Sequence, residues 1–136
     1  MNSKPLVLIV DDEPEMLDIY GTVLRQAGFD VVLARDGQEG IGVAKKTHPD
    51  LILMDIKMPV LDGMDATMKL KSDEATRDIK VVFLTAFGDP EVDKKVAHAY
   101  GAIDFVKKGA TSLDEFARLV GGYIAKGDVG NAPTPS

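Results

Sequence analysis

Acidic side chains follow two short apolar segments, at positions where they could hold a cation. Asp11 and Asp12 come directly after residues 6–10, and Asp55 comes directly after residues 51–54. If these segments are neighbouring parallel strands, their carboxyl ends meet and the three carboxylates converge. Two carboxylates about 4 Å apart repel by about 4 kcal/mol at an effective dielectric constant of 20. Such a cluster therefore needs a cation or a bound proton.

The types of side chain in this cluster favour a hard divalent cation. The chain has no cysteine, and neither of its two histidines is near the acids in sequence. Mg²⁺ suits the set best, because it keeps several waters and takes one or two carboxylates together with phosphate oxygens. Mn²⁺ is the second choice, whereas Ca²⁺ needs more ligands. A carboxylate beside Mg²⁺ can also attack phosphorus and form an aspartyl phosphate.

A hydroxyl and an ammonium group complete the candidate site. Thr85 follows the apolar residues 81–84, and Lys108 comes shortly after residues 103–106. At the same edge of a parallel sheet, both could stabilise the oxygens of a phosphoryl group. The sequence therefore predicts phosphoryl chemistry at a cluster of Asp, Thr and Lys side chains.

Five short apolar segments predict the strands that position these residues. Most are continuously apolar, which is typical of parallel strands buried on both faces, whereas Asp104 interrupts the last one and favours an edge strand. The segments between them are long enough for helical crossovers. Five strands alternating with five helices predict an α/β/α three-layer sandwich. The predicted strands are residues 6–10, 31–34, 51–54, 81–84 and 103–106.

Apolar periodicity and capping residues mark the helices. The first begins at Pro14 and ends before Gly28, with an apolar stripe of Met16, Ile19, Tyr20, Val23, Leu24 and Ala27. Asp36 is the expected N-cap of the second helix, and the third helix follows Asp62-Gly63. Asp89 is the expected N-cap of the fourth helix, with Pro90 at the first helical position, and Ser112 and Glu115 have capping-box spacing in the fifth. Gly40 and Gly42 each cost the second helix, near residues 38–46, about 1 kcal/mol relative to alanine. The third helix presents Met64, Thr67 and Met68 on one side.

Composition and charge narrow the classes of function. The 136 residues carry 16 basic and 22 acidic side chains, a net charge of −6, which disfavours direct nucleic-acid binding. No apolar run is long enough to span a membrane, and the lack of cysteine fits a reducing compartment, so a cytoplasmic location is expected. Residues 1–126 are expected to form one domain, and residues 127–136 a flexible C-terminal tail or linker.

Four stretches of the chain carry a resemblance to a known family. Taken together, they resemble the receiver domain of two-component response regulators, the CheY-like superfamily, over about residues 4–125. The resemblance implies a flavodoxin-like sheet with strand order 2-1-3-4-5. The matching stretches are residues 10–14 (VDDEP), 54–59 (MDIKMP) with Asp62-Gly63, 84–86 (LTA) and 101–108 (GAIDFVKK).

The resemblance also implies a role for each site residue. Asp55 would be the phosphoacceptor, and the Mg²⁺ ligands would be Asp11, Asp12, Asp55 and the backbone carbonyl of Lys57. The resemblance implies that Thr85 and Lys108 are catalytic residues beside Asp55. It also implies that Thr85 provides the switch hydroxyl and Phe105 the switch aromatic ring.

The sequence departs from the family pattern after Lys108. The family usually has a proline in a cis peptide at the next position, whereas this chain has Gly109. A cis bond before a residue other than proline costs about 2.5–4 kcal/mol, so we expect this peptide to be trans.

The resulting hypothesis is a phospho-accepting switch and not an enzyme that turns over a separate metabolite. A histidine kinase or histidine phosphotransfer protein would donate the phosphoryl group to Asp55. Helix 4, strand 5 and helix 5, including Val96, Phe105 and Lys107, would form the surface for an unknown downstream protein or for a second copy of the chain. The cognate kinase, and whether the chain is complete or part of a longer protein, stay open.

Two alternatives belong to other classes of protein. A phosphohydrolase of the haloacid dehalogenase type needs a second aspartate two positions after its nucleophile, where this chain has Lys57. A flavodoxin-like flavin carrier would have neutral, hydroxyl-rich phosphate loops instead of an aspartate pair. A colourless purified protein would exclude the flavin carrier.

Overall fold

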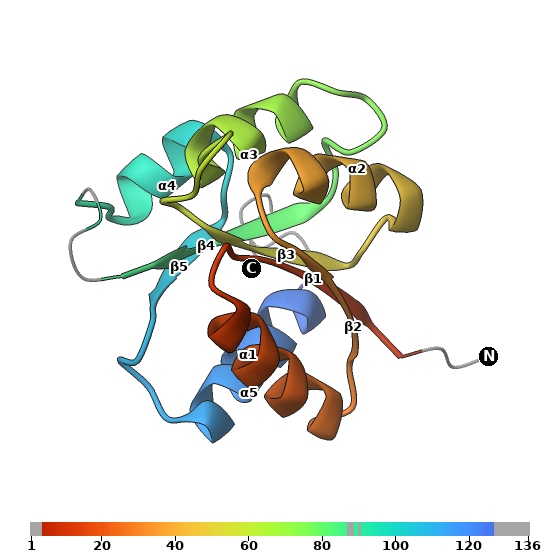
Figure 1. Cartoon of the computed structure of the whole chain (residues 1–136), viewed down its shortest axis with the longest axis vertical. Helices are drawn as coiled ribbons and strands as arrows, with labels where there is room; N and C mark the ends of the chain where they lie inside the picture. The colour runs from red at the N-terminus through yellow and green to blue at the C-terminus, as the bar shows by residue number, and fades with distance from the viewer. Residues whose placement is uncertain (1–3, 87–88, 90, 127–136) are drawn as a thin grey trace.

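The computed structural model describes residues 4–86, 89 and 91–126, in which strands and helices alternate from end to end (Figure 1). The predicted tail at residues 127–136 lies outside the described residues. In chain order the elements are β1 (Leu6–Val10), α1 (Pro14–Gln26), β2 (Asp30–Ala34), α2 (Gly37–Thr47), β3 (Leu51–Asp55), α3 (Gly63–Lys71), β4 (Lys80–Thr85), α4 (Lys94–Tyr100), β5 (Asp104–Lys107) and α5 (Leu113–Ala125).

The five strands form one parallel sheet in the order β2-β1-β3-β4-β5, which confirms the predicted topology. Helices α1 and α5 cover one face, and α2, α3 and α4 cover the other (Figure 1). Because every strand runs in the same direction, the residues that follow β1, β3, β4 and β5 gather at one edge. This edge is where the sequence places its polar side chains.

The sheet separates two apolar clusters, one under each layer of helices. Successive residues of β1 alternate between them: Leu8 and Val10 face α2 to α4, whereas Val7 and Ile9 face α1 and α5. The central strands β1, β3 and β4 are buried nearly throughout, but both edge strands are partly exposed. The prediction of central strands buried on both faces, with Asp104 on an edge strand, is confirmed.

Side-chain caps define three of the helix starts, and those at Asp36 and Ser112 confirm the prediction. The carboxylate of Asp36 accepts the backbone N–H of Glu39, and that of Asp62 accepts the N–H of Asp65. The Ser112 hydroxyl likewise accepts the N–H of Glu115. Each bond satisfies one of the N–H groups that the first turn of a helix leaves without a partner.

The predicted start of the fourth helix is wrong. Asp93, and not Asp89, is the N-cap of α4, since its carboxylate accepts the N–H of Val96 at 2.9 Å. The Asp89 carboxylate instead accepts the N–H of Ala86 at 2.7 Å and closes a turn after β4. Pro90 lies outside the described residues.

Two predicted helix faces are also partly wrong. The buried face of α1 comprises Leu17, Tyr20, Gly21 and Leu24, whereas Ile19 is 43% exposed. In α3 the buried face passes through Ala66, Thr67 and Leu70, and Met68 is 48% exposed. In α1, Leu17 takes the place on the buried face that the prediction gave to Ile19. In α3, the small residues Gly63 and Ala66 lie on the buried face, and Gly63 lets the helix start approach the end of β3.

Within the described part of the chain, no helix is both long and apolar enough to cross a membrane.

Candidate functional site

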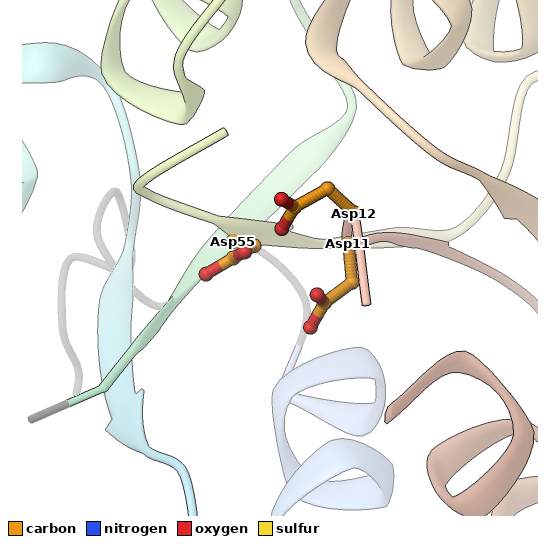
Figure 2. A group of neighbouring side chains, drawn as sticks. All are labelled: Asp11, Asp12 and Asp55. Carbon is orange, nitrogen blue, oxygen red and sulfur yellow. The ribbon is translucent and has the colours of Figure 1, made fainter. Parts of the chain in front are cut away.

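Three carboxylates converge beyond the carboxyl ends of β1 and β3, as predicted. Asp11 and Asp12 follow β1, and Asp55 is the last residue of β3; the two strands are paired neighbours. One oxygen from each of the three carboxylates lies within 4.8 Å of the others. Asp11 and Asp55 are buried, whereas Asp12 is exposed, so solvent reaches the cluster from one side. Figure 2 shows the three side chains directed toward a common space.

Lys108 provides the positive charge that faces this cluster. Its Nζ lies 2.7 Å from Asp11 Oδ2 and 3.2 Å from Asp55 Oδ1, and its side chain is only 9% exposed. The more exposed Glu13 contributes a longer contact of 3.6 Å. One ammonium group therefore serves two buried carboxylates, and the cluster keeps an excess of negative charge.

This excess of negative charge affects the pKa values of Asp55 and Lys108. Burial raises the pKa of Asp55 to about 7, and the charges of Asp11 and Asp12 raise it as well, against the opposing effect of Lys108. Burial disfavours the charged form of Lys108, but its contacts with Asp11 and Asp55 outweigh that cost and raise its pKa to about 12. Lys108 thus stays charged at neutral pH, while the charge of Asp55 depends on its surroundings.

The oxygen atoms present fit a hard divalent cation. Asp11 Oδ2 is buried and accepts no hydrogen bond from the described residues; its contact with Lys108 is an ion pair outside hydrogen-bonding geometry. The other oxygen, Oδ1, accepts the backbone N–H of Glu13 at 2.9 Å, which orients the carboxylate. A cation held by Asp11, Asp12 and Asp55 would give this oxygen a second charged partner and offset the repulsion among the acids.

The loop after β3 is held close to Asp55 by a glycine. A Cβ atom at Gly63 would lie 2.0 Å from the Asp55 carbonyl oxygen, closer than any side chain allows. The Gly63 N–H donates to the Ile56 carbonyl at 2.7 Å, so the first residue of α3 folds back onto the end of β3. This explains the Asp62-Gly63 pair: the aspartate caps α3, and the glycine permits the close approach.

The same loop contains a strained three-residue turn. Val60 has φ of 70° and is 81% exposed, and the Leu61 N–H donates to the Pro59 carbonyl at 2.7 Å. This is the geometry of a classic γ-turn, which β-branched residues adopt at a cost. The strain lies in the segment that links Asp55 to α3.

The remaining predicted residues lie on the same edge but differ in their contacts. Thr85 is buried at the end of β4, and its carbonyl accepts the N–H of Lys108 at 2.8 Å. Phe105 is half-buried on β5 and packs against the cluster under α2 to α4. Lys57 is exposed in the loop after β3, and the proposed use of its carbonyl as a ligand stays a prediction.

The Lys108–Gly109 peptide is trans, as expected, and Gly109 has φ of 79°.

The sequence interpretation missed one residue beside the site. Tyr20 was predicted only as part of an apolar stripe, yet its hydroxyl lies within reach of the charges of Lys108 and Asp11. Only the fold brings α1 next to the loop after β5, so no spacing within the sequence marks this contact.

Comparison with known proteins gives a consistent result. The family model described as Response regulator receiver domain matches residues 7–119. The DNA-binding dual master transcriptional regulator RpaA of Synechocystis is 40% identical over 115 residues, which cover 85% of this chain and 47% of RpaA. The polar-differentiation response regulator DivK of Brucella ovis is 39% identical over 118 residues, 87% of this chain and 94% of DivK. The chain thus spans about half the length of the first curated relatives and nearly all of DivK.

Solved structures agree on the fold. The receiver domain of sensor histidine kinase PA1611 from Pseudomonas aeruginosa, with a magnesium ion coordinated in its active-site cleft, is 29% identical with a TM-score of 0.79; the match covers 90% of this chain and 99% of that one. A putative response regulator from Chloroflexus aurantiacus is 28% identical with a TM-score of 0.81, over 90% of this chain and 99% of that one.

Proposed function

Since this chain belongs to the response regulator receiver domain family, we propose that it is a phospho-accepting signalling switch whose phosphoryl group resides on Asp55. The observation that carries the proposal is the convergence of Asp11, Asp12 and Asp55 around the ammonium group of Lys108. This arrangement combines a buried carboxylate nucleophile with fixed charges that can bind a phosphoryl group and a cation.

In the proposed reaction, an Asp55 carboxylate oxygen attacks the phosphorus of a phosphohistidine on a histidine kinase or histidine phosphotransfer protein. The new O–P bond forms as the N–P bond breaks, and the imidazole leaves with the electron pair of that bond. Lys108 and the Thr85 hydroxyl stabilise the phosphoryl oxygens. Asp11, Asp12, Asp55 and the Lys57 carbonyl would hold Mg²⁺, with Mn²⁺ as a substitute. When bound there, such a cation would supply neutralisation of the charge on the transferring group.

The output surface in this proposal is the face formed by α4, β5 and α5. The structure has a recess of about 530 Å³ there, lined by Lys94 and His98 of α4, Asp104 of β5 and Arg118 of α5, among others. We propose that a downstream protein or a second copy of the chain binds this face. Lys107, the last residue of β5, is exposed and also lines the recess beside Tyr20 and Gly109. The proposed setting is the cytoplasm, without direct contact to nucleic acid or insertion into a membrane.

Labelling by a small phosphodonor tests the proposed function. With Mg²⁺ present, acetyl phosphate should label the unmodified protein at one site, and Asp55→Asn should lose the label because an amide is not an anionic nucleophile. Asp50→Asn is the matched control, since Asp50 is exposed and precedes β3, at the opposite end of the same strand. We expect it to be labelled normally. Labelling of Asp11 or Asp12 in the unmodified protein would contradict the assignment.

A further inference from the structure

Lys108 has its charge in the site, but its backbone lies in a short loop between β5 and α5. One backbone anchor of this loop is the hydrogen bond from the Lys108 N–H to the Thr85 carbonyl at 2.8 Å. A second is the bond from the Ala110 N–H to the Lys107 carbonyl at 3.1 Å, which stays within the loop. Between them, Gly109 adopts a left-handed φ of 79°. The direction of the Lys108 side chain depends on how firmly this turn is held.

Tyr20 contacts this turn from the layer of helices below the sheet. Its side chain is 4% exposed, and its ring stacks on that of Phe116, with centroids 4.3 Å apart and an interplanar angle of 22°. Tyr20, Phe116 and Gly109 line a common recess between α1, α5 and the loop. The stacked, buried ring has little freedom to turn, so its hydroxyl has a defined position.

The tyrosine hydroxyl is a partner for the loop backbone. The backbone N–H of Gly109 faces it closely enough to lower its pKa. Burial raises the pKa of Tyr20 above its ordinary value, with opposing effects from the Lys108 charge and from this N–H. The hydroxyl is therefore neutral at physiological pH and can accept a hydrogen bond from Gly109, the residue next to the lysine of the site.

We propose that Tyr20 is a positioning residue for Lys108: by accepting the Gly109 N–H, its hydroxyl holds the turn that directs the Lys108 ammonium group toward Asp11 and Asp55. This inference rests on the proposed function, in which Lys108 binds the phosphoryl oxygens. Tyr20 itself does not touch the phosphoryl group. Its loss should therefore weaken phosphoryl binding only through Lys108.

Beryllofluoride, a phosphoryl mimic, supplies the test in the presence of Mg²⁺. Its affinity for ¹⁵N-labelled protein can be measured by NMR titration. We expect Tyr20→Phe, which keeps the stacked ring, to bind about three- to tenfold more weakly, the effect of losing one ordinary hydrogen bond. The Gly109 amide signal should shift, and its hydrogen exchange should become faster. Thr47→Val is the control, because it removes a partly buried hydroxyl at the last residue of α2, which belongs neither to the site nor to the α4–β5–α5 face. It should leave both readouts unchanged.

A double-mutant cycle separates positioning from a purely structural role. In a Lys108→Ala background, Tyr20→Phe should cause no further loss of beryllofluoride affinity. An unchanged affinity in Tyr20→Phe, even with a lower melting temperature, would overturn the inference, as would a full additional loss without Lys108. If the unmodified protein itself fails to bind beryllofluoride, the proposed function is refuted instead, which keeps the two failures distinct.

Discussion

At the scale of single residues, the protonation of the site depends on the balance between its carboxylates and its ammonium group, and a bound cation would change that balance. Three carboxylates face one ammonium group there, and burial together with the acidic neighbours raises the pKa of Asp55 to about 7. In the unfolded chain this carboxyl group titrates near 3.8. The folded state therefore holds a proton between these pH values that the unfolded state has lost.

This difference predicts how stability depends on pH and Mg²⁺. The contribution of Asp55 to the metal-free protein is fully present below pH 3.8 and is lost as the pH rises through 7, a loss on the order of a few kcal/mol. Mg²⁺ should restore stability, by about 2.7 kcal/mol when its concentration is a hundredfold above its Kd. The effect of Mg²⁺ should be larger at pH 8 than at pH 5, because protons compete with the cation for the same carboxylate oxygens.

Thermal melts at both pH values, with and without Mg²⁺, measure this effect. In Asp55→Asn the loss of stability between pH 5 and pH 8 should shrink, and in Asp12→Ala the rise in melting temperature with Mg²⁺ should disappear. An Mg²⁺ effect that persists in Asp12→Ala would place the cation elsewhere.

At the scale of elements, glycines decide how closely helices approach the sheet. Gly63→Ala should destabilise the fold by about 1–3 kcal/mol, because the new methyl group overlaps the Asp55 carbonyl oxygen. Gly42 on α2 is the matched control: nothing lies within 4 Å of the Cβ that alanine would add, so Gly42→Ala should stabilise the helix by about 1 kcal/mol. Urea unfolding compares the two. Equal effects at both positions would show that close approach at Gly63 is unimportant.

The same glycines show why the sequence predicts elements better than their packing. Sequence propensity treats Gly40 and Gly42 alike, yet a Cβ at Gly40 would lie 2.9 Å from Val10 Cγ2, whereas Gly42 faces open space. Likewise, Asp89 and Asp93 carry the same capping signal, and only the fold determines that Asp89 closes a turn while Asp93 caps α4. The strands were predictable because runs of apolar residues are local features, whereas the strand order came from the resemblance to the receiver domain family. The meeting of the three acids depended on that order, because it requires the first and third strands to be neighbours.

At the scale of the whole molecule, the proposed function requires one phosphoryl group on Asp55 to change the surface formed by α4, β5 and α5. Phosphorylation adds about two negative charges and three acceptors at Asp55, near the edge where Thr85 ends β4. If the Thr85 hydroxyl turns to donate to them, it vacates space behind β4. Phe105 pairs in register with Phe83 of β4 and packs on the cluster under α4. The Phe105 ring therefore lies where it can move into the space that the Thr85 hydroxyl leaves.

We expect phosphorylation to shift a population between two arrangements of Phe105 and α4, and not to create a new fold. Phe105 has no phenolic hydroxyl, so no side-chain hydrogen bond holds its ring outward, and the unmodified protein should already sample both arrangements. Beryllofluoride should therefore move NMR signals at Thr85, Phe105 and α4 along a line between two end states. Changes confined to the loops around Asp55 would show that the site and the α4–β5–α5 face are not coupled in this chain.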